Sequence, residues 1–338
     1  MDKAPLRPSR ELRGMIDGYR LSQAIHVAAV LGIADLLASG PRPSDDLAQA
    51  TETDPSSLYR LLRALAAAGV LHEAENQVFA LTPVGECLRR DAPESLYGWA
   101  MFVGGANHWH LWSALEFGIR TGDNAFRHVY GTDSWTYRQR HPELGAEFDL
   151  AMSSIANLAM ATLLPIFDFG RFATIVDVGG GDGSLLAAIL ARYPATRGVL
   201  FDQQHVVAGA GAALDRAGVA DRCAIVSGDF FKEIPKHGDA YILKSIIHDW
   251  EDEKAIAILR NCRQAMPEGA ALLAIERDLG SRNEMPESKF SDLNMLLGPG
   301  GRERSSEEYA SLFKATGFEF VGLTRGASGF GIFEGVAR

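Results

Sequence analysis

Hydrophobic positions between residues 11 and 38 recur with helical spacing, which predicts one long helix over this stretch. From residue 24 to residue 37 (AIHVAAVLGIADLL) apolar side chains occupy almost every side of that helix. A helix that is apolar all round has to be buried all round, and a domain of about 90 residues encloses such a helix poorly by itself. We therefore expect a second copy of the chain to cover it, so that the protein is an obligate homodimer.

The pattern that follows is that of two short helices and a small β-hairpin. Residues 43–50 have helical spacing, and Asp54 with Pro55 begins a second helix, because an acidic cap followed by proline is a typical helix start. That helix ends at Gly69. Residues 70–83 (VLHEAENQVFALTP) then alternate like two short strands joined by a turn. This order predicts a winged-helix domain.

A winged helix is also the shape of many DNA-binding regulators, which is the rival interpretation of this region. The helix that would contact DNA offers only Arg60 and Arg63 as cations, and residues 1–95 contain ten basic against thirteen acidic residues. A protein that binds DNA through this shape is expected to present a basic face. The charge therefore favours dimerisation over DNA binding.

An aromatic-rich segment occupies the middle of the chain. Residues 95–115 contain no Asp, Glu, Lys or Arg, but their asparagine and two histidines are costly in hydrocarbon, so we expect buried or pocket-lining protein and no membrane span. Four of the five tryptophans fall between residues 99 and 135. Two interpretations stay open: a helical core between domains, or a pocket for a flat aromatic molecule with Trp109 in its wall.

The last half of the chain alternates strands and helices. Buried strands are expected at 174–178 and 198–202, with later ones near residues 223, 240 and 271 and two terminal apolar segments. Strands separated by helices of this length predict an α/β fold, a Rossmann-like doubly wound and mostly parallel sheet, with ligands at the carboxyl ends of the strands. The domains we expect are a dimerisation domain over 1–95, a helical connector over 96–165 and a ligand-binding catalytic domain over 166–338.

A glycine-rich turn after the first of these strands narrows the choice of ligand. Asp177 is followed by Gly179 and Gly181, but the third glycine of a dinucleotide fingerprint is replaced by Ser184. A carboxylate at Asp177 would repel a pyrophosphate and would suit a ligand with an ammonium group. Asp202 ends the next strand, where an acid can accept hydrogen bonds from both ribose hydroxyls. Together these features indicate S-adenosylmethionine.

The composition excludes several other classes of protein. The chain has 338 residues with a formal net charge of −10, which argues against nucleic acid as the main partner. Three scattered cysteines are too few for a disulfide framework or a zinc site, and no carboxylate cluster has the spacing of a metal site. The first residues lack the apolar segment of a secretory signal, so we expect a cytoplasmic protein.

With these motifs in hand, the chain resembles the plant caffeate and flavonoid type of S-adenosylmethionine-dependent O-methyltransferases, whose bacterial relatives act in antibiotic pathways. The resemblance rests on six motifs in order: DVGGGDGS, LFDQQHVV, GDFF, ILKSIIHDWEDE, IERD and DLNMLLGPGGRERSSEEY. It covers nearly the whole chain, because the winged helix matches that family's dimerisation domain. It implies methylation of a phenolic hydroxyl on an aromatic secondary metabolite.

The resemblance also implies roles for single residues. His248 occupies the position of the catalytic base, flanked by the acids Glu276 and Glu303, while Asp249 is either catalytic or only the cap of the next helix. The implied cofactor-binding residues beside the glycines and Asp177 are Asp202 at the ribose, Asp229 and Phe230 around the adenine, Lys244 at the adenine edge and Trp250 stacked nearby. The implied substrate-binding residues are Trp109, Phe148, Met152, Asn294, Met295 and Gly298.

Two departures from the plant pattern leave the acceptor undefined. Asn294 and Gly298 stand where plant members often have a methionine and an asparagine, so a catechol, a polyketide, a flavonoid and a phenazine all remain open. The chemistry asks for a base independently, because a phenol has a pKa near 10 and a neutral imidazole can take its proton at pH 7. The runner-up keeps the fold but changes the chemistry to N-methylation, decarboxylation or hydroxylation.

Overall fold

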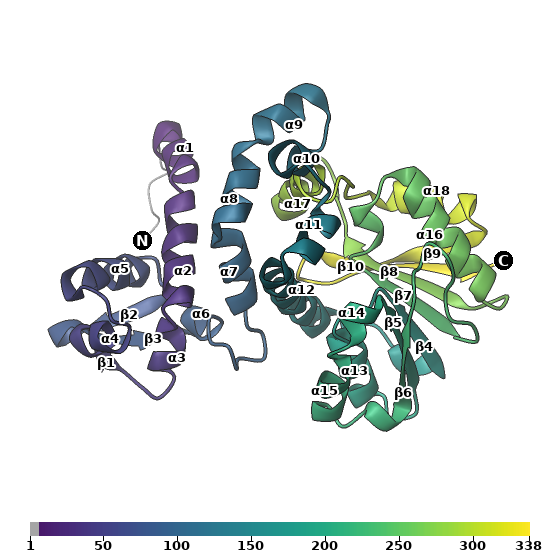
Figure 1. Cartoon of the computed structure of the whole chain (residues 1–338), viewed down its shortest axis with the longest axis horizontal. Coiled ribbons are helices and arrows are strands. Elements are labelled where there is room, and N and C mark those ends of the chain that lie inside the picture. The colour runs from purple at the N-terminus through teal and green to yellow at the C-terminus, as the bar shows by residue number, and fades with distance from the viewer. Residues whose placement is uncertain (1–6) are drawn as a thin grey trace. The chain divides into compact units, whose positions relative to one another are not determined.

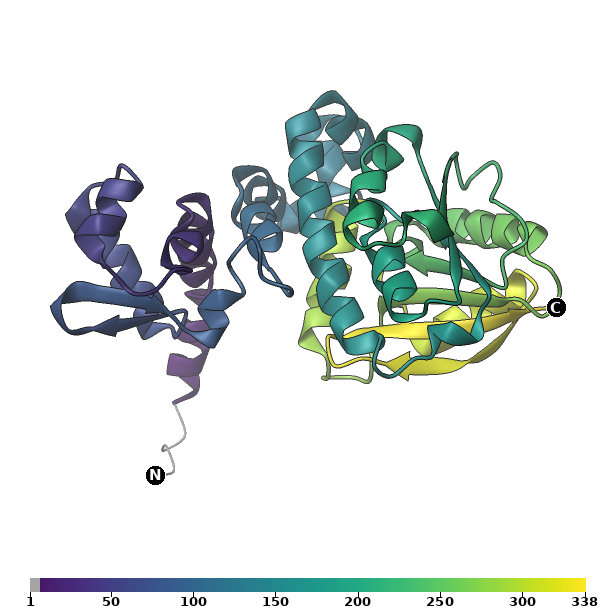
Figure 2. The same ribbon diagram turned by 90° about the horizontal axis from the view of Figure 1, so that it is seen from below.

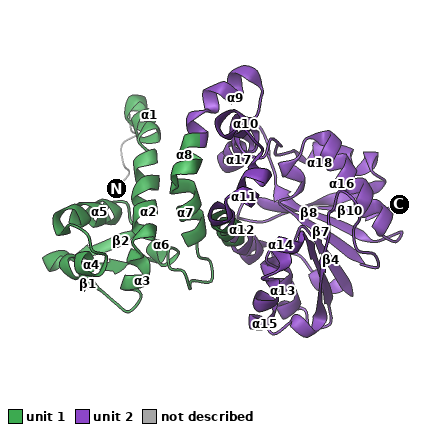
Figure 3. Cartoon of the chain, viewed as in Figure 1, with its two compact units in different colours: residues 1–110, 146–155 green, residues 111–145, 156–338 purple. Residues whose placement is uncertain are grey.

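The computed structural model describes residues 7–338. These residues form two compact units, shown in different colours in Figure 3. The first contains the chain up to residue 110 together with residues 146–155, and the second contains residues 111–145 and 156–338. The domain limits predicted from the sequence stay a prediction. Among residues 7–338, no helix is long and apolar enough to cross a membrane.

The first unit begins with three consecutive helices: α1 (Pro8–Ile16), α2 (Tyr19–Val30) and α3 (Ile33–Leu37). The single helix predicted over residues 11–38 is therefore wrong. The chain breaks at Asp17 and Gly18 and again at Gly32, which takes a left-handed φ of 65°. Apolar side chains recur with helical spacing across both breaks, although α1 buries none of its residues, and for this reason the pattern alone did not reveal the breaks.

The rest of the first unit has the predicted winged-helix order. Its elements are β1 (Arg42–Pro43), α4 (Ser44–Ala50), α5 (Pro55–Ala67), β2 (Leu71–Ala74), η1 (Glu75–Gln77), β3 (Val78–Leu81), α6 (Pro83–Glu86), α7 (Tyr97–Gly104) and the start of α8 (Ala106–Ser113). The three strands form a small antiparallel sheet in the order β1-β3-β2. Asp54 caps α5 by accepting from the backbone N–H of Ser57 at 2.8 Å, as the sequence predicts.

The second unit is built around a seven-stranded sheet. Its strands are β4 (Thr174–Val178), β5 (Arg197–Asp202), β6 (Cys223–Ser227), β7 (Ala240–Lys244), β8 (Ala271–Arg277), β9 (Phe318–Arg325) and β10 (Phe330–Ala337). Their order is β6-β5-β4-β7-β8-β10-β9. Only β10 runs antiparallel to its neighbours, and Figure 2 shows its hairpin with β9 in yellow along one edge. The predicted doubly wound, mostly parallel sheet is thus confirmed.

Helices cover both faces of this sheet (Figure 1). Helices α13 (Ser184–Arg192), α14 (Gln204–Val207), α15 (Ala210–Arg216) and α18 (Ser306–Ala315) contact the strands directly, and α16 (Asp252–Ala265) packs on the same core. The other helices after residue 113 are α9 (Leu115–Thr121), α10 (Ala125–Tyr130), α11 (Ser134–Arg140), α12 (Pro142–Leu163) and α17 (Pro286–Leu297), with short 3-10 turns η2 (Phe169–Arg171), η3 (Ala220–Arg222) and η4 (Ile247–Asp249). The middle of α12, residues 146–155, belongs to the first unit.

Alternation along the strands separates the side chains into two faces. The first face carries Val176, Tyr241 and Leu272, which form one buried cluster with α16 and α18. The second face carries Asp177 on β4 and Lys244 on β7, because Asp177 pairs with Ile242, two residues before Lys244. The sheet thereby brings these two charged residues to the carboxyl end of neighbouring strands, where a doubly wound fold binds its ligands.

Candidate active site

Asp177 stands at the centre of the predicted cofactor site. Its side chain is fully buried, and neither carboxylate oxygen has a hydrogen-bond partner among the described residues. Burial, with a contribution from the nearby Asp202 carboxylate, raises the pKa of Asp177 to about 7. The turn that follows passes very close, since a Cβ on Gly180 would lie 2.7 Å from Asp177 Oδ2. Only glycine at position 180 therefore allows the turn to pass this close to Asp177, and we call this close turn the cradle of Asp177.

The cradle fits the sulfonium cofactor that the sequence predicts. A buried carboxylate without a partner is costly unless a cation pairs with it, and the amino-acid end of S-adenosylmethionine carries an ammonium group. Gly179 and Gly181 both take positive φ values, 74° and 61°, which turn the backbone around this point. Asp202 lies beside the turn and accepts from the backbone N–H groups of Gly181 and Gln203 at 2.9 and 2.6 Å.

The residues predicted around the adenine form an aromatic group on β6, β7 and their following loops. The rings of Phe230 and Trp250 meet edge to face with centroids 6.4 Å apart, and Trp135 stacks on Trp250 at 6.2 Å. The Asp229 carboxylate accepts from the Phe231 N–H at 2.9 Å and pairs with Lys232 at 3.2 Å. The adenine roles of these residues stay predictions.

Lys244 ends β7 on the second sheet face, near Asp177. Burial lowers the pKa of its ammonium to about 8, although the Glu276 and Asp177 carboxylates favour the charged form. Its Nζ lies 5.6 Å from the centre of the Phe330 ring. The adenine-edge role implied for Lys244 stays a prediction, and the strand order places this side chain next to the residue expected at the amino-acid end of the cofactor.

The predicted base and its two acids do come together. His248 lies in η4, directly after β7, and 9% of its surface is exposed. Its Nδ1 is 3.1 Å from Glu303 Oε1 and 3.3 Å from Glu276 Oε2. Its Nε2 is 3.6 Å from Asp249 Oδ1, beyond hydrogen-bond distance. The imidazole is therefore anchored through Nδ1, and Nε2 is the nitrogen that can exchange a proton with a ligand.

Electrostatics in this cluster favour a strongly basic imidazole. Burial opposes the charged form of His248, but the carboxylates of Glu303, Glu276 and Asp249 outweigh it and raise the pKa to about 10. Burial raises the pKa of Glu276 to about 7 and that of Asp249 to about 6. Burial has the same tendency at Glu303, but the adjacent His248 overcomes it, and the pKa of Glu303 is lowered.

Asp249 is not the cap of the helix that follows. The N-cap of α16 is Glu251, and its side chain makes no capping hydrogen bond. Asp249 instead belongs to η4 and faces the imidazole. The alternative that Asp249 is only a helix cap is therefore wrong, because the turn of η4 inserts two further residues before the helix begins.

Three hydrogen bonds of the backbone fix the position of η4. Glu276 Oε1 accepts from the N–H groups of Ile246 and Ile247 at 3.1 and 2.8 Å, so this acid holds the turn as well as the imidazole. On the other side the Arg302 N–H donates to the His248 carbonyl at 2.8 Å. A Cβ on Gly301 would lie 2.0 Å from that same carbonyl, so only glycine permits this approach.

The structure adds residues that the sequence reasoning did not find. Arg304 is fully buried and donates to the carbonyls of Ile247 and Trp250 at 3.0 and 2.8 Å, which holds both ends of the η4 turn. Ser291 on α17 donates to Glu303 Oε1 at 2.7 Å, and Asp292 accepts from the Glu303 N–H at 2.9 Å. No sequence signal could find these pairs, because each joins residues on different elements.

The predicted substrate residues are divided between the two units. Asn294 and Met295 lie on α17 and Gly298 forms its C-cap, all in the second unit. Phe148 and Met152 lie on α12 and Trp109 on α8, all in the first unit. Within that unit Phe148 meets Phe102 edge to face at 5.7 Å, and Trp109 meets Tyr19 at 6.0 Å. Their contact with an acceptor stays a prediction.

The cluster of His248, Glu276 and Glu303 also has the donor set of a metal site. One atom each from His248, Glu276 and Glu303 lies within 4.8 Å of the others. The sequence predicts no metal, because the spacing of these residues along the chain is not that of a metal motif. The Nδ1 to Glu303 hydrogen bond gives the same cluster a role in orienting a base, and metal removal distinguishes the two roles.

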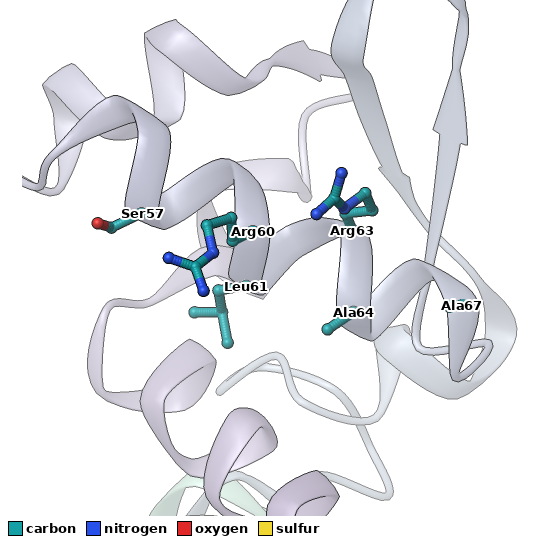
Figure 4. A pocket seen from close by; sticks show the side chains of 6 residues that line it. All are labelled: Ser57, Arg60, Leu61, Arg63, Ala64 and Ala67. Atoms are coloured by element: carbon teal, nitrogen blue, oxygen red, sulfur yellow. The ribbon is translucent and has the colours of Figure 1, made fainter.

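A shallow hollow on α5 has no groups suited to this chemistry. It is lined by Ser57, Arg60, Leu61, Arg63, Ala64 and Ala67 (Figure 4). The guanidinium of Arg63 lies 5.4 Å from the Tyr59 ring. Guanidinium groups do not lose a proton in proteins, so this surface cannot supply an acid or a base.

Comparison with known proteins identifies both parts of the chain. Residues 112–319 match the O-methyltransferase domain family, and residues 14–91 match the O-methyltransferase dimerisation domain. The second match agrees with the charge argument against a DNA-binding regulator.

Curated relatives cover almost the whole chain. Phenazine O-methyltransferase PhzM of Lysobacter antibioticus is 41% identical over 95% of this chain and 94% of its own. Phenazine-1-carboxylate N-methyltransferase of Pseudomonas aeruginosa is 33% identical over 94% of each chain. Among solved structures, CalO1, a methyltransferase of calicheamicin biosynthesis with SAH bound, is 34% identical with a TM-score of 0.86 and full coverage of both chains.

Proposed function

This chain belongs to the O-methyltransferase family and uses S-adenosylmethionine in secondary metabolism, and from that premise we propose that it methylates a phenolic hydroxyl of a small aromatic acceptor with His248 as the general base. The observation that carries this proposal is the anchoring of the imidazole. Its Nδ1 is held 3.1 Å from Glu303 and 3.3 Å from Glu276, which leaves Nε2 for the acceptor.

The division of labour between cofactor and protein follows from the reaction. When bound, S-adenosylmethionine supplies both the electrophilic methyl group and its own leaving group. Asp177 and Asp202, at the carboxyl ends of β4 and β5, would bind its ammonium and its ribose. The remaining task of the protein is to align the acceptor and to take its proton.

The basicity of His248 suits a phenolic acceptor. A phenol has a pKa near 10, and the carboxylates around His248, opposed by its burial, raise the imidazole pKa to about 10. Because the two pKa values are similar, transfer of the phenolic proton to Nε2 has a free-energy change close to zero. The imidazolium formed is stabilised through Nδ1 by Glu303 and Glu276. After methyl transfer the proton leaves Nε2 for water.

The raised pKa gives the pH dependence a definite sign. In the free enzyme at pH 7, the His248 side chain is mostly the imidazolium, because its pKa of about 10 lies above the pH. Only the deprotonated fraction can accept the phenolic proton, so kcat/KM is expected to rise with pH up to about pH 10.

Replacing the base tests the proposal. His248→Ala is expected to lower single-turnover methylation of a phenol by about a hundredfold to ten-thousandfold, the usual range for a positioned general base. S-adenosylhomocysteine affinity, measured by calorimetry, should stay within about twofold of wild type, because the imidazole faces the acceptor. His72→Ala removes an exposed histidine of β2 and serves as the matched control, with unchanged turnover expected.

Three outcomes would contradict the assignment. A variant that keeps near-normal rates at pH 7 would show catalysis by alignment alone. Loss of activity on treatment with a chelator, restored by a divalent metal, would assign the His248 cluster to a metal. Methylation only of amine acceptors would favour N-methylation, the activity for which the P. aeruginosa relative is named. Mass spectrometry of the product also distinguishes decarboxylation and hydroxylation.

We further propose that the chain forms a homodimer through α1 and α2. The dimerisation-domain match covers residues 14–91. In the described chain these two helices expose large apolar side chains that a second copy would cover: Leu12, Met15, Ile16, Tyr19, Leu21, Val27 and Val30. The outward positions of Val27 and Val30, 39% and 51% exposed, fit the expectation that a partner completes the burial of this segment.

A further inference from the structure

Two cations lie side by side on the second face of the sheet, and the reaction as proposed gives one of them no role. Arg277 ends β8, and Lys244 ends the neighbouring strand β7. In the register of the sheet, Lys244 pairs with Ile275, and Arg277 follows two residues later on the same face. Both side chains reach one ring, with the Arg277 Cζ at 4.5 Å and the Lys244 Nζ at 5.6 Å from the centre of Phe330.

Neither cation has a counter-ion among residues 7–338. No carboxylate lies within 4.0 Å of either group, and Arg277 Nη1 is inaccessible to solvent without any hydrogen-bond acceptor. Burial lowers the pKa of Arg277, while the more distant carboxylates of Glu303 and Glu287 favour its charged form. A lysine can respond to burial by losing its proton, but a guanidinium stays charged.

The contact with Phe330 does not satisfy the guanidinium. Packing on an aromatic ring uses the face of the planar group and fixes its orientation. The N–H groups point outward in the plane of the guanidinium, so Nη1 remains without an acceptor. An enclosed N–H of a charged group that lacks an acceptor destabilises the unliganded protein. The arrangement is therefore that of a preformed receptor for an anion.

We propose that Arg277, with Lys244 beside it, binds a carboxylate of a bound ligand. A planar guanidinium matches the two oxygens of a carboxylate. On the same sheet face, the buried Asp177 carboxylate has no hydrogen-bond partner among the described residues. The carboxylate of the cofactor's amino-acid end is the first source. An acid group on the aromatic acceptor is the second, and that source rests on the function proposed above.

Calorimetry on the full-length protein tests this without a turnover assay. The probes are S-adenosylhomocysteine and its decarboxylated form, which keeps the ammonium group and lacks only the carboxylate. Arg277→Met is expected to weaken S-adenosylhomocysteine binding by about tenfold to a hundredfold and to leave the decarboxylated form within about twofold. Arg277→Lys should lose less, because it keeps the charge without the planar fork. The control is Arg282→Met at an exposed arginine of the following loop.

A second pair of probes identifies the alternative source. With S-adenosylhomocysteine present, 3-amino-4-hydroxybenzoate is compared with 2-aminophenol, which lacks only the carboxylate. If the acceptor supplies the anion, Arg277→Met weakens binding of the benzoate alone. Equal affinities for all four probes in wild type and variant would overturn the proposal. Equal weakening of all four would also overturn it, because Arg277 would then support the fold and not a carboxylate.

These outcomes are independent of the proposed reaction. A protein that methylates no phenol but still loses S-adenosylhomocysteine affinity on Arg277→Met would contradict the acceptor assignment and support the carboxylate subsite. Normal phenol methylation with unchanged probe affinities would support the acceptor assignment and contradict the carboxylate subsite.

Discussion

His248 has its chemical properties because of three carboxylates that lie far from it in the sequence or on its own turn. Burial by itself would make the imidazole a weaker base, yet Glu303, Glu276 and Asp249 reverse this and raise its pKa to about 10. The cluster is costly to assemble, since buried acids without full hydrogen bonding destabilise the fold. One oxygen each of Glu276 and Glu303 has no hydrogen-bond partner in the described chain. Such an arrangement is typical of functional sites.

Ser291 tunes this cluster from α17. Its hydroxyl donates to Glu303 Oε1 at 2.7 Å, the same oxygen that lies 3.1 Å from His248 Nδ1. The hydroxyl therefore competes with the imidazole for the negative charge of the Glu303 carboxylate. The same hydrogen bond contributes to the lowered pKa of Glu303. Ser291 is a positioning residue, because it acts through Glu303.

Removing that hydroxyl should shift the pH profile. In Ser291→Ala the Glu303 carboxylate interacts more strongly with the imidazolium, so the pKa of His248 rises further. Because the deprotonated form is the active one, the rise of kcat/KM with pH moves to higher pH. We expect a loss of severalfold at pH 7 that shrinks towards pH 10, measured as kcat/KM for a phenol across this range.

Two variants separate this effect from a loss of packing. Ser291→Thr keeps the hydroxyl and should restore the wild-type profile. Ser288→Ala removes a buried hydroxyl of the same helix that has no hydrogen-bond partner, and it should not shift the profile. A uniform loss at every pH in Ser291→Ala would show a purely structural role.

At the level of elements, α17 connects the base to the predicted acceptor site. It carries Ser291 beside Glu303 and, one turn later, Asn294 and Met295. The end of this helix is capped from another element: Asn124 Nδ2 donates to the carbonyls of Leu296, Leu297 and Gly298 at 3.1, 3.3 and 3.1 Å. The last carbonyls of a helix have no partner within it, so this side chain fixes where α17 ends. Asn124 Oδ1 also caps α10 by accepting from the Arg127 N–H.

Loss of this double cap should affect acceptor binding more than cofactor binding. Asn124→Ala is expected to destabilise the protein by about 0.5–2 kcal/mol, the range for a lost helix cap, and to lower its Tm by a few degrees. Because the end of α17 becomes less ordered, KM for a phenolic acceptor should rise severalfold while S-adenosylhomocysteine affinity stays unchanged. Calorimetry, thermal unfolding and steady-state kinetics measure the three quantities.

A cap on a different helix gives the matched comparison. Asp54→Ala removes the N-cap of α5 in the first unit and should lower Tm without raising the acceptor KM. If both variants raise KM equally, the effect comes from general destabilisation, and the role assigned to Asn124 is contradicted.

For the whole molecule, the feature that bears on the proposed dimer is the exposed apolar surface of α1 and α2. Met15 and Ile16 are 69% and 65% exposed, and exposed apolar residues of this kind are expected at the proposed dimer interface. A charge placed there would have to lose its hydration when a second copy binds.

Ile16→Asp is expected to convert the protein from dimer to monomer at micromolar concentration, as measured by light scattering after size-exclusion chromatography. Val321→Asp introduces the same charge at an exposed apolar residue of β9 in the second unit and should leave the mass unchanged. A wild-type protein that is already monomeric under these conditions would refute the homodimer.

The sequence by itself determined the features that depend on local spacing. The strands around Asp177 and Asp202, the glycine-rich turn between β4 and α13 and the cap of α5 follow from residue patterns over a few positions, and the structure has them where they were predicted. Local spacing did not predict the structure where two different conformations share the same residue pattern. It did not separate one long helix from α1, α2 and α3, and it left Asp249 open between a cap and a site residue.

Only the tertiary structure decided which side chains meet. Arg304 holds the η4 turn through carbonyls more than fifty residues earlier in the chain, and Asn124 caps a helix more than 160 residues later. The two cations at the ends of β7 and β8 share one face because of strand order and register. Hydrophobic periodicity encodes the conformation of each segment, whereas such polar pairs depend on how segments distant in the chain pack, and no local pattern records that packing.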